Sequence, residues 1–103
     1  MSQDVALAQE YKRRVVDAFH ERVAKVVLFG SRARGDSRPD SDWDIAVFLR
    51  GEPLSGDLDR LSDLGFELLL ETNQFIQVIP LPARREMENS RLLSSIRKDG
   101  IAL

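Results

Sequence analysis

Two aspartates, Asp42 and Asp44, stand two positions apart at the start of a run of apolar residues. If this run is a β-strand, residues i and i+2 project from the same face, with Cα atoms about 7 Å apart. Two carboxylates side by side repel each other, and a cation between them relieves that repulsion. Mg²⁺ prefers carboxylate oxygens together with substrate phosphate. The pair predicts a divalent-metal site, although aspartates at the solvated end of a loop would have the same spacing.

A second element suited to chemistry lies a dozen residues upstream. Gly30 and Ser31 follow a short Val-rich run and precede a predicted helix start. Glycine lets a ligand approach the backbone closely, and N–H groups at a helix N-terminus favour an anion. The Ser31 hydroxyl and the guanidinium groups of Arg32 and Arg34 add donors suited to phosphate. A strand followed by Gly-Ser is more often only a turn, so this interpretation depends on the acidic pair that follows.

Taken together, the two elements describe a nucleoside triphosphate site with its own metal ligands. Residues 30–44, GSRARGDSRPDSDWD, resemble the GSxxRGxxxxxSDxD signature of the nucleotidyltransferase superfamily that includes DNA polymerase beta. The short chain resembles the minimal nucleotidyltransferase branch, which has no appended domain. Residues 75–81 resemble the third core strand of that family, and residues 92–103 resemble its C-terminal helix and tail.

The resemblance implies a role for each residue of the motif. Nucleotide binding would fall to four residues: Gly30, Ser31, Arg32 and Arg34. The first two would contact the β- and γ-phosphates, and one of the arginines would hold the triphosphate or the loop around it. Asp42 and Asp44 would be the catalytic carboxylates and would bind Mg²⁺ or Mn²⁺. The family reaction is attack of an acceptor hydroxyl on the α-phosphorus of the nucleotide, which releases pyrophosphate.

The resemblance also implies a partner. Small members of the family are often the antitoxin of a bacterial or archaeal toxin–antitoxin pair, whose toxin is a helical HEPN-domain protein. The implied reaction is AMP transfer from ATP onto that partner. The formal net charge of −2 fits a nucleotide and a protein acceptor better than a long nucleic acid, whose binders carry a basic surplus. A homo-oligomer is also compatible with the sequence.

One position departs from the family pattern. The third core strand usually carries a third carboxylate, and here Gln77 stands in the expected place. An amide cannot act as a base and is a poor metal ligand, so nucleotide binding without turnover is an alternative. The chain would then neutralise a partner by binding alone. A third reading takes Asp42 and Asp44 as the metal motif of a sugar-nucleotide glycosyltransferase, for which the chain is short.

The elements that position these residues follow from apolar periodicity and from turn residues. Predicted helices span 4–23, 31–34, 57–72 and a segment from Asn89 or Ser90 to Gly100, and predicted strands span 25–29, 42–49 and 75–80. Asp4 lies near the start of the first helix, and Pro80 and Pro82 are expected to end the last strand. Residues 101–103 form a tail that could dock. These elements predict an α+β fold of layers in one domain, 1–103, with a small mixed sheet packed by helices, consistent with the polymerase beta-like nucleotidyltransferase fold.

The composition excludes several other classes of protein. The chain has no Cys and one His, so disulfide frameworks, thiolate zinc sites and multi-histidine metal cages are excluded. The longest apolar run, residues 45–49, is far shorter than the roughly 20 residues of a membrane helix. The first ten residues lack the apolar region of a signal peptide. We therefore expect a cytoplasmic protein.

Overall fold

The computed structural model describes residues 5–103, so the prediction for Asp4 lies outside the described residues. The helices are α1 (Ala6–Phe19), α2 (Ser31–Arg34), α3 (Asp57–Thr72) and α4 (Arg91–Asp99), with two 3-10 turns, η1 (His20–Arg22) and η2 (Ala83–Arg85). The strands are β1 (Val23–Phe29), β2 (Trp43–Leu49), β3 (Ile76–Pro82) and β4 (Ile101–Ala102). The α+β prediction is confirmed, with helices and strands close to where periodicity placed them.

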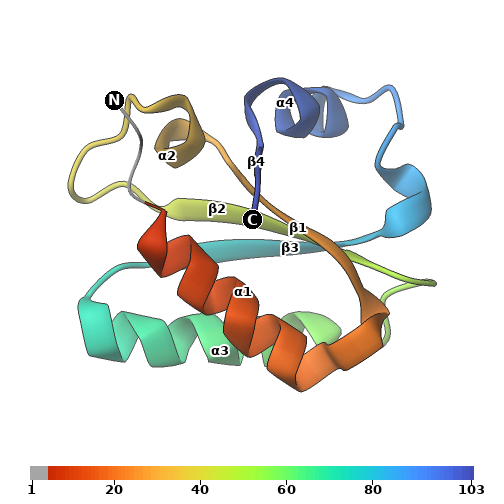
Figure 1. Ribbon diagram of the computed structural model, residues 1–103, viewed down its shortest axis with the longest axis horizontal. Coiled ribbons are helices and arrows are strands. Elements are labelled where there is room, and N and C mark those ends of the chain that lie inside the picture. Colours follow the sequence, from red (N-terminus) through yellow and green to blue (C-terminus); the bar gives the residue numbers. More distant parts are fainter. Residues whose placement is uncertain (1–4) are drawn as a thin grey trace.

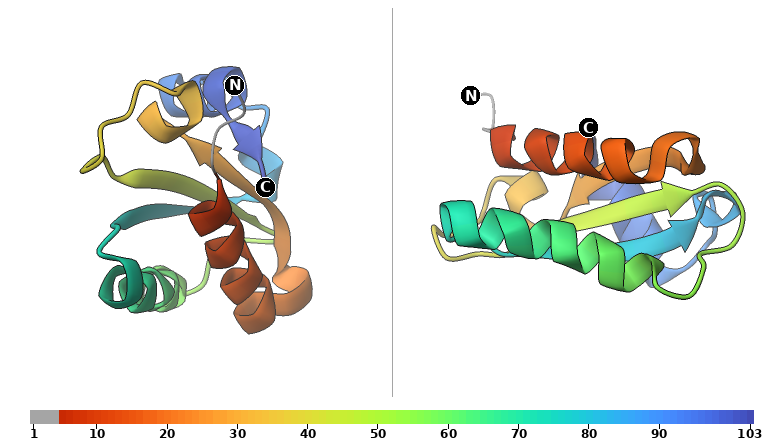
Figure 2. Two further views of the ribbon diagram at one scale, coloured as in Figure 1. Left: turned by 60° about the vertical axis from the view of Figure 1, so that its left-hand side comes forward. Right: turned by 90° about the horizontal axis from the view of Figure 1, so that it is seen from below.

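The four strands form one mixed sheet in the order β3-β2-β1-β4. Strand β2 runs antiparallel to β1 and parallel to β3, and β4 pairs antiparallel with β1. Helices α1 and α3 lie together on one face of the sheet, and α4 lies on the other (Figures 1 and 2). The sheet therefore buries both faces, which explains why β2 is almost continuously apolar.

Two apolar clusters fill the layers on either side of the sheet. The first holds the inner faces of α1 and α3, with Tyr11 and Leu61 fully buried. The second holds Leu93 and Ile96 of α4 against Phe48 of β2. Leu58 is 51% exposed, and the buried residues of α3 are Asp57, Leu61, Gly65 and Leu68. Within residues 5–103, no helix is long and apolar enough to cross a membrane.

The predicted helix over 4–23 is too long at its C-terminal end. Helix α1 ends at Phe19 because His20 takes a left-handed φ of 53°, which stops the helical repeat. Val23, which fits the apolar spacing of the helix, begins β1 instead and pairs with Leu49. The first strand therefore starts two residues before the predicted 25–29 segment. Apolar spacing alone does not distinguish the last helical turn from the start of a strand.

Strand β3 continues past Pro80 and ends at Pro82, so only the second of the two predicted stops is observed. The Phe75 carbonyl accepts a hydrogen bond from the Trp43 N–H, so odd-numbered residues of β3 direct their backbone polar groups toward β2. Pro80 and Pro82 then lie at positions whose N–H would point outward, away from β2. Because β3 is an edge strand, no ladder bond is lost there.

The C-terminal segment docks as predicted. Ser90 caps α4, with its hydroxyl accepting from the Leu93 N–H at 3.1 Å. Residues 101–102 form β4, and the Leu103 N–H donates to the Val26 carbonyl at 3.0 Å. The short tail thus completes the sheet beside β1.

We expect Gly100→Ala to destabilise the protein. A Cβ at Gly100 would lie 2.2 Å from the Ile96 carbonyl oxygen and 2.6 Å from Val27 Cγ1. Either the backbone of α4 or the Val27 side chain must therefore shift. Overpacking of this kind costs about 1–3 kcal/mol. Urea unfolding measures the loss. Gly65→Ala is the matched control: its Cβ would meet Ile76 at an ordinary 3.5 Å inside α3, so Ala is expected to stabilise by about 0.5–1 kcal/mol. Equal stability of the two variants would contradict this account of Gly100.

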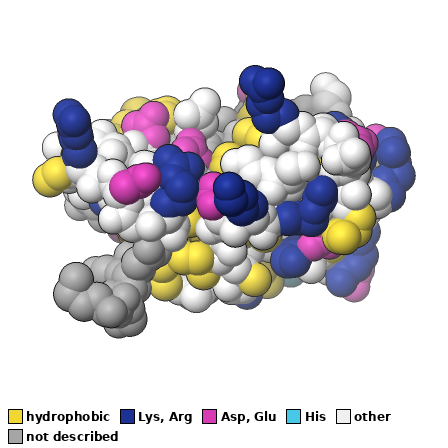
Figure 3. Space-filling view, turned by 90° about the horizontal axis from the view of Figure 1, so that it is seen from above, with side chains coloured by type: hydrophobic (Ala, Val, Ile, Leu, Met, Phe, Trp, Pro, Cys, Tyr) yellow, Lys and Arg dark blue, Asp and Glu magenta, His cyan; other side chains and the backbone are white. Residues whose placement is uncertain are grey.

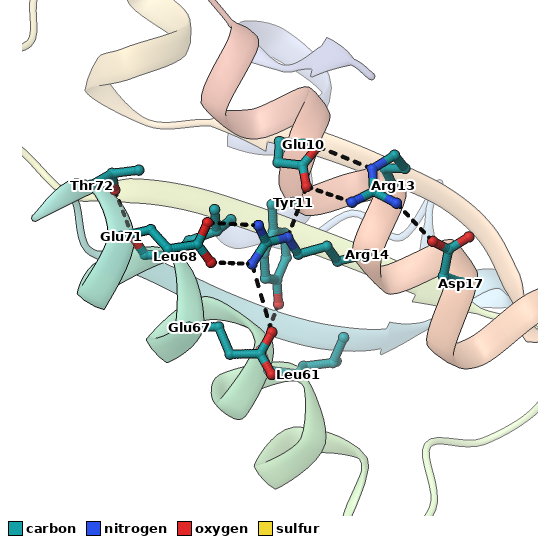
Figure 4. A network of polar contacts seen from close by, with 10 residues as sticks. All are labelled: Glu10, Tyr11, Arg13, Arg14, Asp17, Leu61, Glu67, Leu68, Glu71 and Thr72. Atoms are coloured by element: carbon teal, nitrogen blue, oxygen red, sulfur yellow. Dashed lines mark hydrogen bonds and ion pairs between the residues drawn. The ribbon is translucent and has the colours of Figure 1, made fainter.

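A network of charged side chains joins α1 to α3 (Figure 4). Arg14 donates to Glu10 on its own helix at 2.8 Å and to both carboxylate oxygens of Glu71 at 2.8 and 3.0 Å. Hydrogen bonds from Arg13 and Arg14 lower the pKa of Glu10 to about 2, and Arg14 lowers the pKa of Glu71. Below this network the buried Tyr11 hydroxyl donates to the Leu61 carbonyl at 2.8 Å. Tyr11 is therefore a structural residue.

The network predicts an acid-sensitive contribution to stability. In the folded chain the pKa of Glu10 is lowered from its ordinary value of 4.5 to about 2. The unfolded chain then binds more protons in this window, so stabilisation present above pH 4.5 is lost as the pH falls toward 2. Urea midpoints measured across this range should fall less steeply for Glu10→Gln than for the wild type. Glu21→Gln, an exposed acid outside the network, should keep the wild-type slope, and an unchanged slope in Glu10→Gln would refute the assignment.

Candidate functional site

Gly30 forms the turn between β1 and α2. Its backbone has φ 73° and ψ −158°, a region that is essentially restricted to glycine. The Gly30 carbonyl accepts from the Ala33 and Arg34 N–H groups at 3.1 and 3.0 Å, which starts the short helix. Gly35 ends that helix with a φ of 86°. The predicted helix over 31–34 is thus confirmed.

Asp44 lies directly against this turn. It pairs with Phe29 across β1 and β2, one residue before Gly30. A Cβ built on Gly30 would lie 2.3 Å from Asp44 Oδ2, so no larger residue fits beside the carboxylate. The structure therefore brings the two predicted halves of the site together, and the glycine is required by close approach as well as by its φ.

The electrostatics of the two aspartates favour a cation. Asp42 is exposed, just before β2, whereas Asp44 is half-buried within the strand. Burial raises the pKa of Asp44, the Asp42 charge raises it further, and Arg34 opposes both effects. The carboxylate thus sits in a partly desolvated place beside a like charge, and a bound cation would relieve this cost.

The donor set fits one hard cation shared with a phosphate. Among residues 5–103, no group of three or more His, Cys, Asp or Glu side chains is placed to hold a metal ion. Asp42 and Asp44 supply two carboxylates, and Mg²⁺ completes its octahedron with water and substrate phosphate oxygens. Gly30 carries no side chain and so lets the Asp44 carboxylate approach the turn that opens α2.

Gln77 stands next to the acidic pair. The parallel register places it opposite Asp44 on the neighbouring strand, so the two side chains share one face of the sheet. Gln77 is exposed. The register locates this residue independently of the sequence motif.

Arg32 holds the loop between α2 and β2. Its guanidinium donates to the carbonyls of Pro39 and Ser41 at 3.1 and 2.9 Å. It also lies over the Trp43 ring, 4.5 Å from the ring centroid. Trp43 is 7% exposed and packs on the face opposite the acidic pair, as alternation along a strand requires. Of the two roles implied for this arginine, the structure places it in the loop.

Gln74 is a site residue that the sequence did not reveal. Its Oε1 accepts from Trp43 Nε1 at 2.9 Å and from Arg32 Nη2 at 3.3 Å. One amide oxygen thus fixes both the tryptophan and the arginine that hold the loop. No local pattern around Gln74 marks it, because its two partners lie 31 and 42 residues away in the chain.

Arg34 lies on the outer side of the site. It contacts Asp36 at 3.2 Å and Asp99, at the end of α4, at 3.6 Å, and its side chain is 43% exposed. Its charge reaches Asp44, whose pKa it lowers. Both signs of charge occur on the face that carries α2 and α4 (Figure 3). Arg34 therefore remains placed to meet an anionic ligand in front of the aspartates.

Comparisons with known proteins agree with this geometry. The family described as "Polymerase beta, Nucleotidyltransferase" matches residues 14–102. Two relatives come from Methanocaldococcus jannaschii. "Putative protein adenylyltransferase MJ0604" is 34% identical over 79 residues, which is 77% of this chain and 73% of that protein. "Putative protein adenylyltransferase MJ0141" is 31% identical over 49 residues, 48% of this chain and half of that protein.

Solved structures share the fold. A crystal structure of a "putative nucleotidyltransferase" from Sulfolobus solfataricus superposes with a TM-score of 0.65 at 26% identity, covering 95% of this chain and 77% of that one. A toxin–antitoxin crystallised with AMP-PNP gives a TM-score of 0.64 at 17% identity, covering 91% of this chain and 70% of that one. At that identity the second likeness shows the fold alone. With the motif, the sheet order and the family match in agreement, this chain belongs to the polymerase beta nucleotidyltransferase family and fits its minimal branch.

Proposed function

We propose that this protein transfers AMP from ATP to a hydroxyl group of a protein, in a metal-dependent reaction. The observation on which the proposal rests is the close packing of the Asp44 carboxylate against Gly30, in the turn between β1 and α2. This contact brings the proposed phosphate-binding turn next to a carboxylate that could bind a cation. The relatives named as protein adenylyltransferases support the choice of AMP and of a protein acceptor.

The residues of the proposed site have two roles, which are binding of the nucleotide and stabilisation of the charge on its phosphates. Gly30 and Ser31 bind the β- and γ-phosphates, and Arg34 adds a cation in front of them. Asp42 and Asp44 would hold Mg²⁺ or Mn²⁺, and the ion would supply charge neutralisation at the phosphates. The acceptor hydroxyl bonds to the α-phosphorus and loses its proton, and the bond to the leaving pyrophosphate breaks. Arg32 acts through the loop that carries Asp42. Such a reaction depends mainly on positioning and electrostatics, which a small domain can supply.

We further propose that the acceptor is a HEPN-domain toxin and that this chain, as one minimal domain over residues 1–103, is its cytoplasmic antitoxin. The fold shared with toxin–antitoxin structures, one of which contains AMP-PNP, supports this assignment.

The test is transfer of label from α-labelled ATP to the protein that the neighbouring gene encodes, with Mg²⁺ and with EDTA. We expect label on the partner only with the metal. Binding of ATP, followed separately by titration, shows whether the nucleotide site is intact. ATP binding without label on any protein would overturn the transferase proposal.

The register of Gln77 beside Asp44 favours a second candidate, a module that binds nucleotide and partner without turnover. The Asp42→Ala/Asp44→Ala double variant separates the two functions. Loss of neutralisation in a folded double variant supports transfer, whereas retained neutralisation supports binding alone. Gln77→Asp provides the complementary variant, because a restored carboxylate should raise transfer only if the amide limits it.

A further inference from the structure

The outer edge of β3 is an open sheet edge next to the candidate site. Strand β3 has β2 on one side and no strand on the other. The register turns the backbone polar groups of its even-numbered residues outward. Within residues 5–103, the outward N–H groups of Ile76 and Val78 therefore have no sheet partner. Such an edge is a template for an added strand.

The prolines restrict this template to one end of the strand. Pro80 and Pro82 occupy the next two outward positions and have no N–H to donate. An added segment can therefore receive backbone hydrogen bonds only beside Ile76 and Val78. These two residues flank Gln77, which lies opposite Asp44. The open half of the edge is thus the half at the candidate site.

A groove runs along this half of the edge, between β3 and α3. It has a volume of about 380 Å³ and is lined by Ser62, Asp63, Phe66 and residues 75–78. Phe66 and Phe75 are 56% and 49% exposed, so two aromatic rings face solvent there. Asp63 is the charged residue of the lining. A chain segment with an apolar side chain and a Lys or Arg would complement this surface.

We propose that the outer edge of β3 at Ile76–Val78, with the groove beside α3, docks an extended segment of the acceptor protein as an added strand. Main-chain hydrogen bonds would hold the segment, and side chains on one of its faces would contact Phe66 and Asp63. Side chains on its other face would lie beside Gln77, about 10 Å from β2 given the strand spacing. A hydroxyl side chain at that position extends across Gln77 toward Asp44. This inference rests on the proposed function.

The proposal is tested by selecting peptides that bind to the protein in the absence of ATP. A displayed library of short random peptides with a central Tyr, Ser or Thr is selected on the wild-type protein, and amide exchange of Ile76 and Val78 is followed with the enriched peptides. We expect apolar residues alternating with Lys or Arg, and slowed exchange at both amides. Phe66→Asp should weaken binding by about tenfold or more. Leu70→Asp is the matched control, one turn along α3, 73% exposed and outside the groove lining, and should bind as the wild type does.

Three results would decide against the docking proposal. No enrichment, equal binding to Phe66→Asp, or unprotected Ile76 and Val78 amides would overturn it. Protection of these amides without peptide that disappears on dilution would assign the edge to a second copy of this chain. ATP titration, followed at the Gly30 and Ser31 amides, tests the proposed function separately. Peptide docking without ATP binding would leave the docking surface standing while the transferase assignment fails.

Discussion

Asp44→Asn should reduce AMP transfer by about 100- to 1,000-fold, the scale observed when one group that stabilises transition-state charge is removed. The variant keeps the volume of the side chain and removes its charge. Asp44 is the half-buried member of the acidic pair and the one that contacts the Gly30 turn. Loss of its charge would remove one of the two proposed metal ligands. Rates of label transfer from ATP measure the effect.

The same substitution should leave stability unchanged or increase it. Burial and the Asp42 charge raise the pKa of Asp44, so stability present at low pH is lost as the pH rises through that pKa and the carboxylate ionises. Asn cannot ionise and avoids this cost. Mg²⁺ with ATP should raise the melting temperature of the wild type more than that of Asp44→Asn. Asp40→Asn, an exposed acid in the preceding loop, should behave as the wild type in both measurements. Full transfer by Asp44→Asn would exclude this carboxylate from the reaction.

Gly30→Ala should damage both the fold and the site. Its backbone conformation costs a non-glycine residue about 1–3 kcal/mol. The added Cβ would also lie 2.3 Å from Asp44 Oδ2 and 3.1 Å from Asp44 Cγ, so the carboxylate must move. We expect a lower urea midpoint together with loss of transfer and weaker ATP binding.

Gly51→Ala is the control for backbone strain. Gly51 also has a positive φ, 78°, but a Cβ there would meet nothing within 4 Å. It should lose stability through its φ alone and keep ATP binding and transfer. If the two variants bind ATP equally well, close approach of Asp44 is not the reason for glycine at position 30.

The local sequence pattern was sufficient to predict those parts of the site that are formed by residues close together in the chain. Helix α2, its stop at Gly35, and the start of β2 follow from turn residues and apolar spacing within residues 30–49. The opposite orientation of Trp43 relative to the two aspartates follows from strand alternation alone. For the same reason the helix over 57–72 was predicted at its observed bounds.

Features that depend on contacts between distant segments could not be predicted from the local sequence pattern. The end of α1 at Phe19 is set by the backbone of His20, and the passage of β3 through Pro80 depends on that strand lying at the sheet edge. Gln74 acquires its role from Trp43 and Arg32, which reach it only in the folded chain.

The chemical groups of the candidate site can therefore be recognised from the residues alone: a Gly-Ser turn, two same-face aspartates and a glutamine on the next strand. How these groups meet depends on the folded sheet. The antiparallel pairing of β1 with β2 brings Asp44 beside Gly30, and the parallel pairing of β2 with β3 sets Gln77 beside Asp44. Spacing along a chain fixes which side chains share a face, whereas strand register, which depends on burial of the whole sheet, fixes which faces come together.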